Sequence, residues 1–248
     1  MSALSGRYAV VTGGGSGIGL ACGRMLREAG AEVLIVGRSA ARLRAAADAI
    51  GAVWRTCDVS DGESVRAALD SVDADLLVNN AGAAESAPFH RTDEALWERM
   101  IAVNLTGTYR CIRALLPGMI ARGWGRVVNI ASTAGLKGYA YVSAYCAAKH
   151  GVIGLTRALA VEVAKTGVTV NAVCPGYTDT ELTAASARRI AEKTGRQADD
   201  VLRELAAGNP QGRLIMPEEV AQAVISLCLP HSGAINGAAL AVAGGEIG

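Results

Sequence analysis

The sequence predicts an α/β fold in which one doubly wound parallel sheet carries helices on both of its faces. Short, continuous apolar runs alternate with segments of helical periodicity from the first strand to the last. Strands that are apolar along their whole length are typical of parallel sheets, because such sheets are covered on both sides. Crossovers between parallel strands are right-handed, so this alternation predicts a Rossmann-like arrangement.

The N-terminal half begins with a predicted strand over 8–11 that runs into a glycine-rich turn. A helix follows, and Gly30 ends it as a C-terminal cap residue does. The second strand covers 31–36, and Ser39 is placed to cap the next helix. Later strands are predicted at 53–57, 75–78, 126–131, 169–173 and 239–242, and later helices at 64–69, 96–103, 105–120 and 143–164.

Residues 177–216 interrupt the alternation, with helical stretches around 184–193 and 199–207. An insertion over the C-terminal edge of a parallel sheet is where a substrate lid belongs. Since no linker or internal repeat divides the sequence, we expect a single dinucleotide-binding and catalytic domain over 1–248 that carries this lid.

The composition argues against several classes of partner. The formal net charge is +1, from 24 basic and 23 acidic residues, which leaves no electrostatic footprint for nucleic acid or an anionic membrane. Apolar runs are far shorter than the ~20 residues of a membrane span. The N-terminus lacks a secretory signal, and the six cysteines form no C-x-x-C pair. We therefore expect a cytoplasmic enzyme with buried, reduced thiols, a small-molecule substrate and no metal site.

The turn after the first strand has the spacing T-G-x-x-x-G-x-G, from Thr12 to Gly19. Glycines let the backbone approach a pyrophosphate, and a helix N-terminus offers it free N–H groups and a positive dipole end. A glycine-rich turn alone is a weak signal, but this one lies between a strand and a helix, as dinucleotide binding requires. The residues expected to hold the cofactor here are Gly13, Ser16, Gly17, Ile18 and Gly19.

The end of the second strand bears on the choice of cofactor. An acidic residue there binds the ribose 2′-OH of NAD, whereas an arginine accommodates the 2′-phosphate of NADP. Gly37 occupies this position and Arg38 follows it, with no carboxylate nearby. This favours NADP(H). NAD(H) stays open, because Arg38 could instead stack on the adenine and because Ser16 in the glycine turn is not basic.

Ser132, Tyr145 and Lys149 form the predicted catalytic set. Tyr145 and Lys149 are four positions apart, so they share one face of the predicted helix. A neighbouring ammonium favours the phenolate and lowers the pKa of a phenol. A phenol so tuned passes a proton to or from a substrate oxygen while hydride moves to or from the cofactor. Ser132, at the end of the preceding strand, is placed to hydrogen-bond the same oxygen.

These motifs together resemble the short-chain dehydrogenase/reductase family over essentially the whole chain. The matching residues are Thr12, Gly13, Gly17, Gly19, Asp58, Val59, Asn79 to Gly82, Asn104, Ser132, Tyr145, Lys149, Pro175 and Gly176. The lid and the stretch from Asn209 to Leu214 look similar to enzymes acting on 3-oxoacyl and 3-hydroxyacyl substrates.

The resemblance implies further roles. Asp58 and Val59 would hold the adenine end, and the backbone of Asn80, Ala81 and Gly82 would line the cofactor. Asn104 would bend a helix and bind a water linked to Lys149 in a proton relay; it could also be a helix cap between two helical runs, which is compatible with both roles. Lys149 would also bind the nicotinamide ribose. Pro175, Gly176, Thr178 and Thr180 would border the nicotinamide carboxamide. Family members pair their long helices, so a homotetramer is expected.

Other features are less specific. Ala243 stands before Gly244 and Gly245, where the family usually has an acidic residue. A basic cluster on the lid, Arg188, Arg189, Lys193 and Arg196, is either a solvated helix face or a site for a carboxylate or carrier phosphate. Leu136, Tyr139 and Tyr141 are predicted to line the substrate pocket. Two other functions stay open: a dinucleotide-sensing binding protein, and an epimerase or dehydratase on the same fold.

Overall fold

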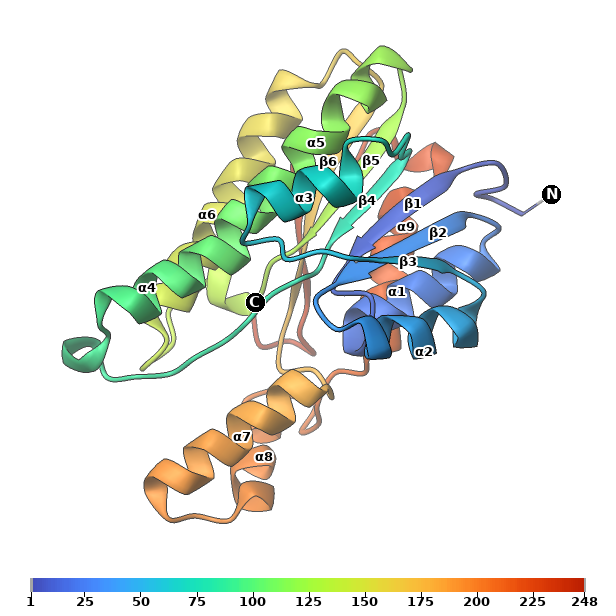
Figure 1. Ribbon diagram of the computed structural model, residues 1–248. Coiled ribbons are helices and arrows are strands. Elements are labelled where there is room, and N and C mark those ends of the chain that lie inside the picture. The colour runs from blue at the N-terminus through green and yellow to red at the C-terminus, as the bar shows by residue number, and fades with distance from the viewer. Residues whose placement is uncertain (1, 248) are drawn as a thin grey trace.

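One sheet of seven parallel strands organises the molecule, in a computed structural model that describes residues 2–247. Met1 and Gly248, the outermost residues of the predicted domain, lie outside this range. The strand order is β3-β2-β1-β4-β5-β6-β7 (Figure 1). The strands are β1 (Tyr8–Thr12), β2 (Glu32–Gly37), β3 (Val53–Thr56), β4 (Leu76–Asn79), β5 (Gly125–Ile130), β6 (Val168–Pro175) and β7 (Ala239–Val242). The predicted fold class is confirmed.

Helices cover both faces of the sheet (Figure 1). The longer ones are α1 (Gly17–Glu28), α2 (Ala40–Ile50), α3 (Gly62–Leu69), α4 (Glu94–Ile101), α5 (Gly107–Ala121), α6 (Ser143–Glu162), α7 (Glu181–Thr194), α8 (Ala198–Ala207) and α9 (Pro217–Cys228). The short ones are η1 (Phe89–Arg91), η2 (Ala102–Thr106), η3 (Thr133–Gly135) and η4 (Pro230–Ser232).

Alternate residues of each central strand enter different cores, as the period of two in a strand requires. Val11 and Ile35 belong to the core under α1 and α9. Their neighbours Val10 and Leu34 belong to the core under α3 and α5. Both faces of these strands are therefore dry, which accounts for their unbroken apolar sequences.

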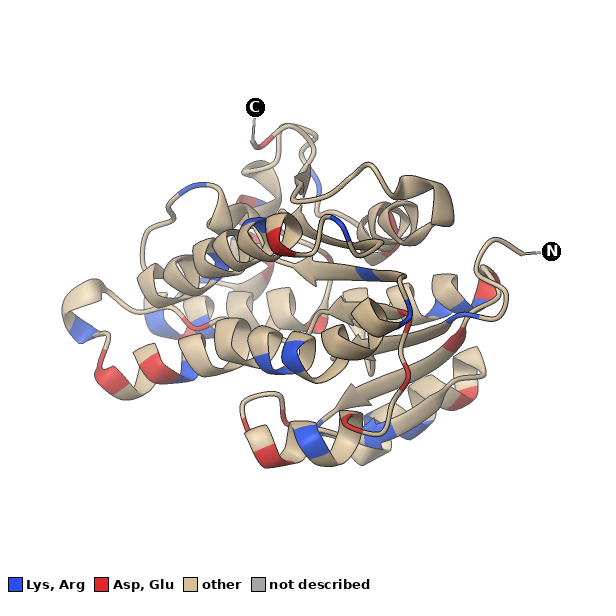
Figure 2. Cartoon of the chain, turned by 90° about the horizontal axis from the view of Figure 1, so that it is seen from above, with Lys and Arg blue, Asp and Glu red and all other residues tan. Residues whose placement is uncertain are grey.

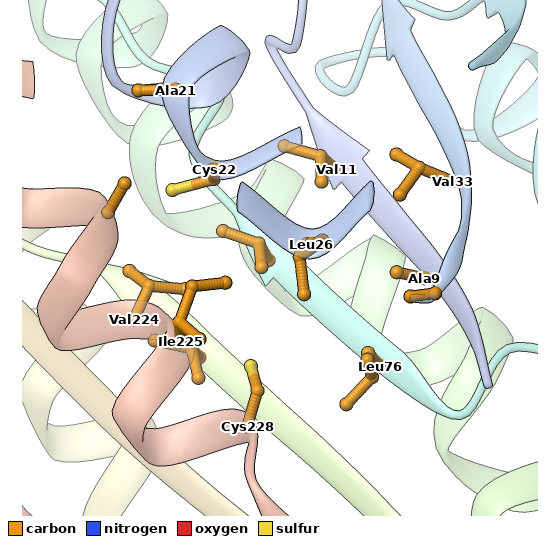
Figure 3. Packing of buried hydrophobic residues seen from close by; sticks show 14 of the residues in the cluster. Ala9, Val11, Ala21, Cys22, Leu26, Val33, Leu76, Val224, Ile225 and Cys228 are labelled. Carbon is orange, nitrogen blue, oxygen red and sulfur yellow. The ribbon is translucent and has the colours of Figure 1, made fainter. Parts of the chain in front are cut away.

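Helices α1 and α9 pack against each other over the sheet. Figure 3 shows Cys22 and Leu26 of α1 between the strands and Val224 and Cys228 of α9. Leu26 is 0% exposed, and complete burial of a leucine contributes roughly 1.5–3 kcal/mol to folding. The sequence pattern did not predict α9, although it completes this face of the molecule.

The segment after β6 leaves the sheet as a pair of helices, α7 and α8, which project from the rest of the molecule in Figure 1. A bridge between Thr178 and Ile215 closes the excursion at its base. Ala187, Ala191 and Val201 form a small core of their own between the two helices. The region is thus a helical hairpin on two short stems.

One predicted boundary was wrong. Residues 94–121 form one helical stretch, because the π-helical turn η2 joins α4 to α5 where a break was expected. Strand β3, predicted at 53–57, is present and largely exposed, because it is an edge strand with a single neighbour. Within residues 2–247, no helix is long and apolar enough to cross a membrane. Charges of both signs are interspersed along the helices in the view of Figure 2.

Candidate active site

The turns after β1 and β4 are tied together at the C-terminal edge of the sheet. The Thr12 hydroxyl accepts the backbone N–H groups of Asn80, at 2.9 Å, and of Ala81, at 3.0 Å. In return the Asn80 side-chain amide donates to the carbonyls of Thr12, at 3.0 Å, and Gly13, at 3.2 Å. Sequence reasoning assigned only backbone to Asn80; its side chain in fact fixes the glycine turn.

The glycine turn allows no side chain at its tightest points. Gly13 and Gly17 have positive φ angles of 65° and 51°. A Cβ on Gly19 would lie 2.3 Å from the Gly13 carbonyl oxygen, and one on Gly17 would lie 3.1 Å from Thr180. Side chains here would therefore strain the backbone or collide.

The N-terminus of α1 opens at this turn. Ser16 is exposed at its N-cap and forms no capping hydrogen bond within the described chain, 2–247. Ile18 points toward the core under α1, so its backbone is the part that faces the turn. An uncapped helix N-terminus beside close-packed glycines fits a pyrophosphate. The residues present thus suit a dinucleotide.

Arg38 and Asp58 follow neighbouring strands, β2 and β3. Arg38 is exposed. The Asp58 carboxylate accepts hydrogen bonds from the Ser60 hydroxyl, at 2.6 Å, and the Ser60 N–H, at 2.9 Å, and these bonds, aided by the charge of Arg38, lower its pKa. Val59 is buried against Gly107. This edge of the sheet therefore presents the exposed guanidinium of Arg38 and the ionised carboxylate of Asp58.

Ser132, Tyr145 and Lys149 come together beyond β5. The Ser132 hydroxyl accepts the N–H of Ala134 at 3.1 Å and hydrogen-bonds Tyr145. Tyr145 and Lys149 lie in the first two turns of α6, and the Lys149 ammonium is 5.6 Å from the centre of the Tyr145 ring. Lys149 also donates to the carbonyl of Ile130 at 2.8 Å. The predicted neighbours are therefore adjacent in space.

Burial controls the titration of this pair. It raises the pKa of Tyr145 to about 12, while the hydrogen bond with Ser132 lowers it and Tyr177 raises it further. Burial lowers the pKa of Lys149 from 10.5 to about 8. The expected lowering of the Tyr145 pKa by Lys149 is thus not found in this structure, where desolvation of the phenolate is the largest cause of the shift.

Asn104 lies inside the π-turn η2 and is 1% exposed. Its amide donates to the carbonyls of Ala83, at 2.9 Å, and Met100, at 3.0 Å, and its oxygen accepts the N–H of Ala83 at 3.2 Å. A Cβ on Gly82 would lie 2.9 Å from the Asn104 oxygen and 3.8 Å from the Lys149 ammonium. Asn104 therefore neighbours Lys149 across Gly82, and the prediction of a cap between two helical runs is wrong.

The loop after β6 holds the remaining predicted cofactor residues. Pro175 ends the strand, and the Gly176 N–H donates to Val242 at 3.1 Å. Thr178 is buried, and its hydroxyl donates to Gly176 at 3.0 Å. Thr180 caps α7 by accepting the N–H of Thr183, and it also touches the glycine turn at Gly17. One end of the lid thus begins beside the cofactor turn.

Polar contacts hold the lid to both sides of the sheet edge. Arg42 of α2 makes two hydrogen bonds, at 2.7 and 3.0 Å, with the carboxylate of Glu181 on α7. Farther along α7, Arg189 donates to the carbonyl of Ala84 at 2.8 Å and Lys193 to that of Ser86 at 3.1 Å. The helix therefore spans from the glycine turn to the loop after β4.

A second polar cluster adjoins Ser132. Tyr139 donates a short hydrogen bond to the carboxylate of Glu246, and Lys137 pairs with the same carboxylate at 3.2 Å. Tyr139 is the one predicted pocket residue found here. Tyr141 is 66% exposed, because its backbone turns outward with a φ of 69°, and Leu136 packs against the core under α6. Glu246 was not predicted as a site residue. The available signal was that this chain has an acidic residue after the Gly-Gly pair, where the family usually has one before it.

Comparison with known proteins agrees with this geometry. The family model for short chain dehydrogenase matches residues 7–191. The chain is 45% identical to cis-4-hydroxycyclohexanecarboxylate dehydrogenase of Sinomonas cyclohexanicum, over 98% of this chain and 97% of that protein. It is 36% identical to D-beta-hydroxybutyrate dehydrogenase of Cupriavidus necator, over 98% and 99%. A crystal structure of actinorhodin polyketide ketoreductase with NADPH superposes with a TM-score of 0.94, at 36% identity and 99% coverage of both chains.

Proposed function

The chain belongs to the short-chain dehydrogenase family and is an oxidoreductase of alcohol and ketone groups, and from this premise we propose the residues that perform the reaction. Tyr145 is the general acid and base, Ser132 holds the substrate oxygen, and Lys149 supports Tyr145 and binds the ribose of the cofactor. The observation that carries the proposal is the grouping of these three side chains at the C-terminal edge of β5.

In the reducing direction Tyr145 gives its proton to the carbonyl oxygen as that oxygen gains negative charge. The raised pKa of Tyr145 keeps the phenol protonated at neutral pH, which is the form that a general acid requires. Ser132 donates a second hydrogen bond to the same oxygen. In the oxidising direction the same groups act in reverse, with the phenolate accepting the proton of the alcohol.

Asn104 and Lys149 would form the relay that returns a proton to Tyr145. They face each other across Gly82, which is small enough to leave space between them. The π-turn keeps the Asn104 amide on the Ala83 and Met100 carbonyls, so its oxygen is fixed in direction. A water bridging Asn104 and Lys149 would complete the relay.

NADP(H) is the proposed cofactor, and when bound it supplies or accepts the hydride. The glycine turn, with Gly13, Ser16 and the first turn of α1, would hold its pyrophosphate. Arg38 would pair with the 2′-phosphate, supported by its exposure and by the absence of a carboxylate at the end of β2. Asp58 and Val59 would border the adenine, and Ala81 and Gly82 the ribose. Pro175, Gly176, Thr178 and Thr180 would border the carboxamide.

The proposed substrates are secondary alcohols or ketones of the 3-hydroxyacyl and 3-oxoacyl type. The related D-beta-hydroxybutyrate dehydrogenase and polyketide ketoreductase support this class. We treat residues 1–248 as one domain in which α7 and α8 form the substrate lid, because α7 crosses from Gly17 to Ser86 over the sheet edge.

We further propose a homotetramer in the cytoplasm. Apolar side chains are exposed on long helices, with Val161 of α6 80% exposed and Tyr109 of α5 44% exposed. Paired helices in an assembly would cover them. Six free, buried cysteines suit a reducing compartment.

The test is turnover of ketones with each reduced cofactor, followed by the absorbance of the reduced nicotinamide. We expect the wild type to favour NADPH, and Arg38→Asp to lower kcat/KM for NADPH by about 10- to 100-fold, since it removes a hydrogen bond to a charged group and adds repulsion. Arg24→Asp, on the outer side of α1, is the matched control. Wild-type preference for NADH would overturn the Arg38 assignment.

The same assay separates the other functions. Product formation without net change in cofactor absorbance would indicate an epimerase or dehydratase. Cofactor binding without turnover of any carbonyl compound would indicate a dinucleotide-sensing protein.

A further inference from the structure

A buried carboxylate stands beside the reacting residues. The Glu246 side chain is 6% exposed, although it follows the last strand of the sheet. Its carboxylate accepts a short hydrogen bond from the Tyr139 hydroxyl and pairs with the Lys137 ammonium at 3.2 Å. The Thr133 hydroxyl lies 2.7 Å from that of Tyr139. Since the Tyr139 hydroxyl donates its hydrogen bond to Glu246, it must accept a hydrogen bond from the Thr133 hydroxyl.

This cluster adjoins the proposed site of reaction on two sides. Thr133 directly follows Ser132, which would hold the substrate oxygen. On the other side, a Cβ on Gly176 would lie 2.9 Å from the second oxygen of Glu246, and Gly176 belongs to the proposed nicotinamide border. The carboxylate therefore lies between the segment after β5, which carries Ser132, and the loop after β6.

Tyr177 links the cluster to Tyr145. Its ring meets the Tyr139 ring edge to face, with centroids 6.4 Å apart and planes at 83°. It is also close enough to Tyr145 and to Glu246 for their charges to interact. Tyr177 therefore neighbours both Tyr145 and the Tyr139–Glu246 cluster.

Lys137 and Tyr139 together have the chemistry of a carboxylate receptor. An ammonium supplies charge, and a phenol aimed by Thr133 supplies a directed donor. The Lys137 side chain is 41% exposed, so its stem reaches the cluster from the surface while its head meets a nearly dry carboxylate. Removing the carboxylate without replacement would leave these donors unpaired.

The backbone before Glu246 suits the exchange of its carboxylate for another one. It follows Gly244 and Gly245, whose φ angles of 59° and 92° lie in the left-handed region. A Cβ on Gly244 would lie 2.1 Å from the Asn209 side chain, so that residue must be glycine. Two glycines in succession give the backbone before Glu246 more conformations than any other pair.

We propose that Lys137 and Tyr139 form the subsite for a free carboxylate of the substrate, and that Glu246 competes with that carboxylate for them. The inference rests on the oxidoreductase function proposed above and narrows it to hydroxy acids and oxo acids. The alternative, a carrier-bound thioester, would need cations for the carrier phosphate. On the lid, Arg189, Lys193 and Arg196 are already engaged with Ala84, Ser86 and Glu204, so within residues 2–247 Arg188 is the exposed member of this cluster that lacks such a partner and would meet such a phosphate.

Acetoacetate and its methyl ester, which share one ketone and differ only at the carboxyl group, provide the test. The readout is the ratio of kcat/KM for the acid to kcat/KM for the ester, measured with NADPH on the full chain. Lys137→Gln should lower this ratio by at least about tenfold, because the charge that favours the acid is lost. Glu246→Gln should raise the ratio, because the internal competitor loses its charge. Lys165→Gln, which changes an exposed lysine in the turn after α6, is the charge-matched control and should leave the ratio unchanged.

The outcomes separate this inference from the function beneath it. If the wild type reduces neither compound nor any other ketone, the proposed function itself fails. If the ester is reduced and Lys137→Gln leaves the ratio unchanged, only the carboxylate subsite is wrong. A Glu246→Gln variant that loses acid and ester activity equally would make Glu246 a structural anchor and would overturn the proposed competition.

Discussion

At the scale of single residues, the proposed chemistry depends on Tyr145 and Lys149, whose pKa values are shifted by burial. The phenol of Tyr145 holds its proton more tightly than a free tyrosine, and the ammonium of Lys149 holds its proton less tightly than a free lysine. Both shifts favour the neutral forms, as desolvation does. The cost of keeping Lys149 charged at neutral pH is therefore part of the stability of the protein.

This cost can be measured with Lys149→Met. Between the folded pKa of about 8 and the unfolded value of 10.5, the unfolded state binds more protons at Lys149 than the folded state. Stability therefore rises with pH across this window. From pH 7 to pH 10 the wild type should gain roughly 2–3 kcal/mol of unfolding free energy relative to Lys149→Met. Urea unfolding at both pH values measures it; parallel changes in the two proteins would show that Lys149 is not desolvated.

The grouping of Tyr145, Lys149 and Ser132 could be predicted from the sequence. Spacing alone brought Tyr145 and Lys149 onto one helix face, and a strand end placed Ser132 near them. The pattern could not reveal the balance of desolvation and charge that sets the Tyr145 pKa, because burial depends on the whole fold. Nor could it identify the partners of Glu246, since Lys137 and Tyr139 lie more than a hundred residues earlier in the chain.

At the scale of elements, strands were easier to predict than the joints between helices. Apolar runs marked most of the strands, and Ser39 caps α2 as expected, by accepting the N–H of Arg42. The π-turn at Asn104 escaped prediction, because one extra residue in a turn shifts the apolar pattern of α5 relative to that of α4, so that the stretch looks like two separate helices. Helix α9 escaped it as well, although Pro217 and Glu219 form an ordinary helix start.

The two helices of the proposed lid were predicted from the sequence, but their contacts with the rest of the molecule were not. Two helical stretches were expected in 177–216, and α7 and α8 lie there. The basic residues of α7 were expected to face solvent or a ligand. Arg189 and Lys193 instead hold the helix to the loop after β4, through backbone carbonyls that no sequence pattern identifies.

At the scale of the whole molecule, the proposed tetramer has a direct test. Light scattering should give the mass of four chains. Val161→Glu places a charge on the exposed valine of α6 and should produce smaller species. Val53→Glu, on the exposed valine of edge strand β3, is the matched control and should leave the mass unchanged. A wild type with the mass of one chain would contradict the tetramer.

The sheet gathers its functional residues along one edge. The turns after β1 and β4, the loop after β5 and the loop after β6 all follow the carboxyl ends of parallel strands, where ligands of open α/β sheets bind. Their shared position explains how residues from Gly13 to Thr180 can serve one reaction.

The most direct test of this account is the Tyr145→Phe variant, which removes one hydroxyl and keeps the ring. NADPH should bind with unchanged affinity, measured by nicotinamide fluorescence, because Lys149 and the glycine turn are intact. Turnover of a ketone that the wild type reduces should fall by about 10²- to 10⁴-fold, the usual contribution of a general acid. Normal cofactor binding with the full wild-type rate would contradict the central role of Tyr145.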